Sequence, residues 1–165
     1  MTLNLKFNIG DHVVYPAHGV GKLVCIESHE IAGTEIKLLV IDFEREKMTL
    51  RIPMTKAYNS GLRALSSIQD MESLLKTLSI KARPKKIMWG RRAQEYENKI
   101  NSGDLNSLAD VLRELYDRNG DIDQSYSERQ IYQVALERLT RELTIVAAVD
   151  EKSAVQMIEQ HLSAA

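Results

Sequence analysis

The chain has 165 residues, of which 44% are hydrophobic, and a formal net charge of -1 at pH 7. This length can bury a core as one medium domain or two small ones, and we expect two. The single cysteine, Cys25, excludes an internal disulfide and a metal site of paired thiols, which fits a reducing cytoplasm. No apolar run follows a basic start and none reaches about 18 residues, so we expect neither an export signal nor a membrane contact.

The charges are unevenly distributed along the chain. Residues 1–62 carry seven basic and seven acidic side chains, residues 63–100 carry nine and four, and residues 101–165 carry six and twelve. Within the basic middle, residues 81–92 (KARPKKIMWGRR) contain six basic side chains, no acid and the only tryptophan, Trp89. Basic residues bind phosphates by releasing counterions, and an indole can stack on a base, so this segment is a candidate nucleic-acid contact.

The first part of the chain, from Phe7 to Pro53, favours β-strands. Pro53 ends the last long strand because proline cannot donate to the ladder, and Ala32-Gly33 predicts a hairpin tip. The stretch His18–Gly21 (HGVG) could be taken for a phosphate loop, but it joins two strands, which favours a tight turn that needs glycine. Short runs rich in Val, Ile, Leu and Tyr predict a small SH3-like or Tudor-like barrel with strands at 12–16, 21–31, 34–43 and 47–53.

After Gly61 the spacing of the apolar residues becomes helical. Leu, Ile and Met recur every three or four residues from Leu62 to Leu78, which predicts a first helix. The basic segment follows, and Pro84 is suited to open a second helix that Gly103 closes.

The remaining apolar pattern predicts three more helices. Asp104 caps one whose apolar stripe runs through Leu115, and Ser125 with Glu128 forms a capping box for the next. The helix after this capping box is expected at 126–148, and a final helix is expected at 152–162. We therefore expect an α+β chain with a barrel domain at residues 1–60 and an all-helical domain at residues 61–165.

Catalytic motifs are missing from the sequence. The four histidines lie in no metal-ligand spacing, and no serine lies in a G-x-S-x-G turn. We expect a protein that is not an enzyme and that takes no cofactor, metal or small-molecule substrate.

Two residues have both a structural and a functional interpretation. A lone tryptophan such as Trp89 is more often core, but Lys85, Lys86 and Arg92 would share its face of a helix, which is unusually cationic for a core seam. An edge-strand arginine such as Arg51 is commonly just solvent-facing. Its functional interpretation is that it docks a partner on an exposed strand.

Several motifs follow one another along nearly the whole chain. They are GDHVVYPAHGVGKL, LRIP, the tryptophan and two arginines of the basic segment, NSGDL and ERQIYQVALERLTREL. Together they resemble the CarD/CdnL family of bacterial transcription regulators. The first part also resembles the polymerase-interacting module of transcription-repair coupling factor. The resemblance implies a cytoplasmic, nucleoid-associated regulator whose Tudor-like domain binds the RNA polymerase β subunit. Its helical domain would contact the promoter minor groove at the upstream bubble edge and stabilise the open complex.

The resemblance also implies roles for individual residues. Arg51 matches the family's arginine that contacts the β subunit, and His29 stands where an arginine can aid this docking. Trp89 matches the minor-groove tryptophan, while Gln94 replaces a basic residue after it. The basic residues expected to contact DNA are Lys85, Lys86, Arg91, Arg92 and Arg129.

Two other functions remain open from the residues alone. A Tudor-like or RNA-binding adaptor could use the basic segment without polymerase, or the acidic helices could bind a protein while the basic segment is only solvated. A methyl-lysine reader needs an aromatic cage, and Phe7, Tyr15 and Phe43 are too few and too scattered for one. We expect a monomer.

Overall fold

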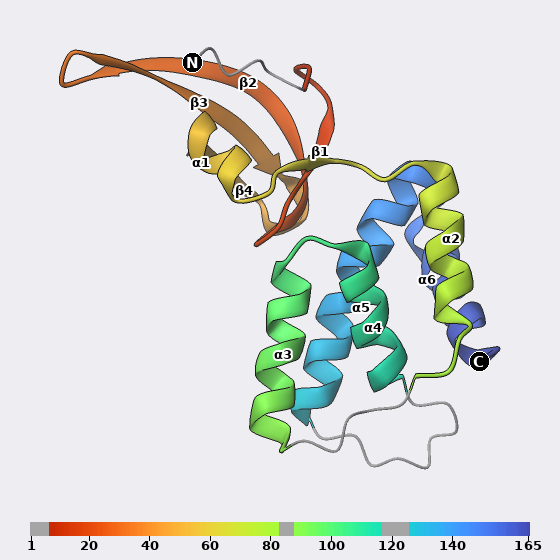
Figure 1. Cartoon of the computed structure of the whole chain (residues 1–165). Coiled ribbons are helices and arrows are strands. Elements are labelled where there is room, and N and C mark those ends of the chain that lie inside the picture. Colours follow the sequence, from red (N-terminus) through yellow and green to blue (C-terminus); the bar gives the residue numbers. More distant parts are fainter. Residues whose placement is uncertain (1–6, 83–87, 117–125) are drawn as a thin grey trace. The chain divides into compact units, whose positions relative to one another are not determined.

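The structure is a computed structural model that describes residues 7–82, 88–116 and 126–165, except for the side chain of Trp89 (Figure 1). It divides into two compact units, Met1–Leu65 and Ser66–Ala165. The first unit contains an antiparallel sheet and the second is helical. The predicted α+β class is confirmed.

The first unit is built on a five-stranded antiparallel sheet in the order β4-β3-β2-β1-β5. A 3-10 turn, η1 (Glu44–Glu46), precedes β4, and a short helix, α1 (Met54–Asn59), follows it. The strands are β1 (His12–Tyr15), β2 (Gly19–Ile31), β3 (Thr34–Phe43), β4 (Met48–Pro53) and β5 (Arg63–Ala64). The order puts β4 and β5 at its two ends.

The turn between β2 and β3 is the predicted hairpin tip. Ala32 and Gly33 have φ values of 51° and 79°, and Ile31 pairs with Thr34 across the turn. Positive φ at both central residues is the geometry of a two-residue type I′ turn, whose twist matches that of the strands. This turn sets the register of the long β2–β3 ladder.

The core of the first unit lies on one face of the sheet, because side chains alternate between faces along a strand. Helix α1, which was not predicted, adds Met54 and Ala57 to this core; six residues are too few for a helical period to show in the sequence. The sheet contributes Val13, Tyr15, Leu23, Leu39, Ile41, Phe43 and Ile52.

Glycine is required in the HGVG stretch for two reasons. Gly19, the first residue of β2 after the turn from β1, has a φ of +86°, at which other residues would be strained. A Cβ on Gly21 would lie 2.6 Å from Ile41 Cγ2 and 2.9 Å from Phe43 Cε1. The stretch is therefore a tight turn leading into a strand that approaches the core closely, as predicted.

The second unit contains five helices within its described residues. Helix α5 packs against all four of the others, and the core is built mainly of leucines. No helix of the described ranges combines the length and apolar character needed to cross a membrane. The helices are α2 (Ile68–Leu78), α3 (Trp89–Asn101), α4 (Leu105–Leu115), α5 (Tyr126–Ala147) and α6 (Glu151–Ser163).

The predicted boundary between α3 and α4 is confirmed. Gly103 has a φ of 75° just after α3, and the Asp104 side chain accepts a hydrogen bond from the Asn106 N–H at 3.2 Å. Asp150 caps α6 in the same way through the Ser153 N–H at 2.8 Å. Ser125, of the predicted capping box, lies outside the described residues.

The first helix of this unit begins later than predicted. The side chain of Ser67 accepts a hydrogen bond from the Asp70 N–H at 3.1 Å and so caps α2, which begins at Ile68. Leu62 belongs to the core of the first unit, and Arg63–Ala64 pairs with β1 as β5. The recurrence of apolar residues every three positions before Ser67 therefore did not reflect a helix.

We predict that Gly21→Ala lowers the free energy of unfolding of the first unit by about 1–3 kcal/mol, because the added methyl group overpacks the core. Urea denaturation followed on the backbone amides of β2 measures the change. Ser28→Ala, at an exposed position of the same strand, should stay within about 0.5 kcal/mol of the wild type. An unchanged free energy of unfolding for Gly21→Ala would contradict the close approach of Gly21 to Ile41 and Phe43.

Candidate functional site

The side chains of Glu27, His29 and Arg51 form a charged cluster on one face of the sheet, called here the Glu27 cluster. Arg51 of β4 pairs with Val40, which pairs with Cys25, and Glu27 and His29 follow Cys25 at alternate positions of β2. The Arg51 Nε donates a hydrogen bond to Glu27 Oε2 at 3.2 Å. His29 Nε2 lies 3.0 Å from the same oxygen.

The cluster is accessible but ordered by its own contacts. The side chains of Arg51 and His29 are 58% and 52% exposed, whereas that of Glu27 is 30% exposed. The hydrogen bond with His29, followed by the positive charge of Arg51, holds the pKa of Glu27 below its ordinary value. Exposed ion pairs add little to stability, so the main effect of Glu27 is to orient the two neighbouring side chains.

Arg51 also lies on a strand at the end of the sheet order. Within the described sheet, β4 pairs with β3 alone. An edge strand presents backbone groups to which a partner strand can pair. The predicted edge position of Arg51 is thus confirmed. The sequence did not predict that Glu27 links Arg51 to His29. Glu27 could have been found from the sequence, because it precedes His29 by two residues in a strand.

The helical unit gathers arginines at one end. Helices α3 and α5 begin at the same end of the unit, as Figure 1 shows. The arginine end is defined here by Arg91 and Arg92 of α3 and Arg129 of α5. Arg91 and Arg129 are exposed, and Arg92 is half-buried.

The start of α3 carries positive charge without a cap. Met88, at the N-cap position, makes no side-chain capping bond, and the first turn has no acid. The N–H groups of Arg91 and Arg92 both donate to the Met88 carbonyl, at 3.0 and 3.1 Å. A helix N-terminus is itself electropositive, so arginines there oppose the helix dipole and favour an anion as partner.

Arg92 is held in place by a buried tyrosine. Its Nη2 donates to Tyr96 Oη at 3.0 Å, and its Cζ lies 5.7 Å from the Tyr96 ring centroid. Burial raises the pKa of Tyr96, which therefore stays protonated as a neutral partner. Gln94 instead donates to Asn98 Oδ1, at 3.1 Å, along its own helix.

Several predicted DNA contacts lie outside the described residues. These are Lys85, Lys86 and the side chain of Trp89. Because α3 begins at Trp89, the helical spacing that was expected to put both lysines on the tryptophan's face does not apply to α3.

Arg113 of α4 was missed by the sequence analysis. Its Nε donates to the Ile80 carbonyl at 2.8 Å and its Nη2 to the Lys81 carbonyl at 3.4 Å, where the basic segment begins. The Arg113 side chain is only 16% exposed and also pairs with Asp110. The two carbonyl partners, of Ile80 and Lys81, are 33 and 32 residues away in sequence, so no local pattern reveals them.

Comparison with known proteins follows the same division of the chain. Residues 7–66 match the family model described as "CarD-like/TRCF RID domain", and residues 73–159 match "CarD, C-terminal domain". The chain belongs to the CarD family. This CarD-family chain is also similar to "Putative transcription factor YdeB" of Bacillus subtilis (strain 168), with 28% identity over 146 residues, covering 88% of the chain and 95% of that relative. The predicted resemblance is confirmed.

These matches make the CarD-family chain a CarD-like transcription factor with a TRCF RID-like domain. The family is one of transcription regulators and is not a known class of enzymes. Among the described residues, no group of histidine, cysteine and acidic side chains is arranged to hold a metal ion.

We predict that His29→Ala and Arg51→Ala each raise the pKa of Glu27 towards its ordinary value, because each removes a group that favours the ionised carboxylate. The side-chain carboxyl ¹³C shift of Glu27, followed by NMR against pH, measures this. The stability contributed by Glu27 is present above its ordinary pKa and is lost as the pH falls through the lowered value.

Lys37→Ala is the matched control for this titration. Lys37 pairs with Ser28, so its side chain lies on the opposite face of the sheet from Glu27. Its removal should leave the pKa of Glu27 unchanged. An ordinary pKa of Glu27 in the wild type would argue against the cluster.

Proposed function

We propose that this CarD-family protein docks on the RNA polymerase β subunit through the Glu27 cluster and the edge strand β4. The arginine end and Trp89 would then hold promoter DNA at the upstream edge of the transcription bubble and stabilise the open complex. The observation that carries this proposal is the exposed Arg51 on the edge strand of a unit that matches the CarD-like/TRCF RID domain.

The docking step combines backbone pairing with a charge contact. A strand of the β subunit added to β4 would gain main-chain hydrogen bonds, and the side chains of Arg51 and His29 would select the partner. Glu27 holds Arg51 in position before binding, which reduces the side-chain entropy lost at the interface. An acidic group of the partner would share or replace the contact with Glu27.

The DNA step depends on phosphates first. Arg91, Arg92 and Arg129, with Lys85 and Lys86, would position the unit on the backbone without reading sequence. The uncapped start of α3 supplies backbone N–H groups and a partial positive charge for the same phosphates. Docking on polymerase raises the local concentration of this end at the promoter, so weak contacts suffice.

Trp89 would act on melted rather than intact duplex. Stacking of an aromatic side chain on an unpaired base is worth roughly 1–3 kcal/mol. A contact made only in the open complex shifts the closed-to-open equilibrium by its full differential affinity. Since about 1.4 kcal/mol is tenfold in an equilibrium constant, one such contact changes the open population substantially.

We predict that Arg51→Glu abolishes co-purification of the full chain with the β subunit, because it places a like charge beside Glu27 and removes the docking cation. Lys56→Glu, an exposed charge reversal on α1, is the control and should bind normally. Retention of Arg51→Glu on the β subunit at normal affinity would refute the docking assignment. Retention of the wild type on RNA but not on the β subunit would favour the adaptor function instead.

We predict that Trp89→Ala shortens the lifetime of the open promoter complex by about tenfold, as expected for the loss of one stacking contact. Polymerase binding should stay intact. Lifetimes are measured by competitor challenge of preformed complexes. Ile68→Ala, which removes an exposed apolar side chain from α2, is the control. Unchanged lifetimes for Trp89→Ala would exclude this role of the tryptophan.

A further inference from the structure

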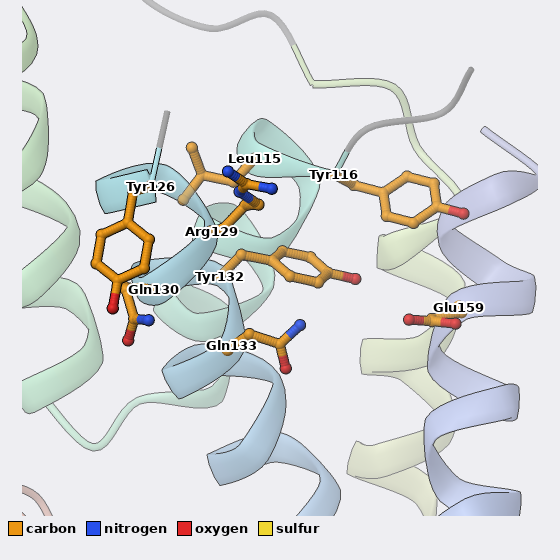
Figure 2. Close-up of a pocket in the computed structure, with 8 residues that line it drawn as sticks. All are labelled: Leu115, Tyr116, Tyr126, Arg129, Gln130, Tyr132, Gln133 and Glu159. Atoms are coloured by element: carbon orange, nitrogen blue, oxygen red, sulfur yellow. The ribbon is translucent and has the colours of Figure 1, made fainter. Parts of the chain in front are cut away.

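A pocket of about 500 Å³ opens beside the first turns of α5 (Figure 2). Three tyrosines line it, Tyr116 at the end of α4 and Tyr126 and Tyr132 on α5. Its two charged side chains come from different helices, Arg129 from α5 and Glu159 from α6. A concave site between helices with aromatic walls and a few polar groups is typical of ligand binding.

The pocket contains a buried polar atom that lacks a partner. Tyr132 is only 9% exposed, and among the described residues its hydroxyl has no hydrogen-bond partner. In Figure 2 the Tyr132 ring extends from α5 towards Glu159. Buried side-chain polar atoms are nearly always satisfied, so this hydroxyl points to a group that binds beside it.

Three residues with side-chain oxygens line the pocket together: Tyr116 just after α4, Tyr132 on α5 and Glu159 on α6. The Tyr116 and Tyr132 ring centroids lie 6.3 Å apart with an interplanar angle of 37°. Burial raises the pKa of Tyr132, and Glu159 and Tyr116 nearby raise it further, so the phenol keeps its proton. Tyr116, Tyr132 and Glu159 are called here the oxygen corner.

The charges of the pocket are separated. In the part of the chain that the structure describes, half-buried Glu159 forms no salt bridge. In Figure 2, Arg129 lies on the other side of the Tyr132 ring from Glu159. A ligand cation is therefore attracted to the oxygen corner and repelled from the Arg129 side.

We propose that the oxygen corner binds a primary ammonium group. An ammonium has three N–H donors, which match the two phenol oxygens and the Glu159 carboxylate. Tyrosine rings additionally attract a cation through their electron-rich faces. A guanidinium, being a planar fork, fits a corner of three separate oxygens less well. The group can belong to a small free amine or to a lysine side chain.

The test is an NMR titration of the full chain with cadaverine, a free diamine, and with Nα-acetyl-lysine amide, which carries a lysine side chain. Saturable shifts should be confined to the amides around Tyr116, Tyr132 and Glu159. Tighter binding of cadaverine assigns the site to free amines, and tighter binding of the lysine derivative assigns it to a protein lysine. The neutral analogue 1,5-pentanediol should give no saturable shift.

Three variants locate the ammonium. Glu159→Gln should weaken binding by about tenfold, because a charge-assisted bond is lost. Tyr132→Phe should weaken it by about fivefold, the loss expected for one neutral hydrogen bond. Glu72→Gln, which removes an exposed carboxylate from α2, should leave the affinity unchanged.

The stability of Tyr132→Phe separates this site from a structural role. Removing a hydroxyl without a partner should leave the melting temperature unchanged or raise it. The proposal is overturned if neither amine gives saturable shifts, if pentanediol binds equally well, or if Glu159→Gln binds as the wild type does. It is also overturned if Tyr132→Phe melts earlier and perturbs residues 117–125, since the chain itself would then supply the partner.

Discussion

The long helix α5 is the element on which the helical unit depends. It packs against α2, α3, α4 and α6, and its buried face carries Ala135, Leu139 and Leu143. Glu142 on the same helix is buried and accepts a hydrogen bond from the Ser66 N–H at 2.9 Å, which ties the first residue of the unit to its centre. Because α5 is one continuous helix, these contacts also fix the position of its first turns, which lie at the end of the unit where α3 begins.

That placement gives the first turns of α5 two different surroundings. Arg129 comes to the same end of the unit as the arginines of α3, whereas Tyr132, one turn later, is enclosed next to α6. Arg129 and Tyr132 are three residues apart, which is most of a helical turn, so their positions on the helix do not by themselves explain why their surroundings differ. Burial separates them, since Arg129 is exposed and Tyr132 is not.

The Glu27 cluster and the arginine end each hold an arginine side chain in place before a partner binds. Glu27 orients Arg51 on the sheet, and Tyr96 orients Arg92 on α3. A side chain held before binding loses less entropy when it binds, but each such contact remains partly exposed and therefore modest. Two modest contacts in one chain can still act strongly, because engagement of the first raises the effective concentration of the second.

The sequence by itself determined what local chemistry controls: the hairpin at Ala32-Gly33, the Gly103 and Asp104 boundary, the apolar face of α5 and the membership of the CarD family. It missed α1 and β5, which are too short to show a period, and it began α2 too early. Only the tertiary structure decided that Glu27 joins His29 to Arg51, that Arg113 holds the start of the basic segment, and that Tyr116, Tyr132 and Glu159 line one pocket. These contacts join residues on different strands and helices, and such distances are set by sheet register and helix packing, which no local spacing encodes.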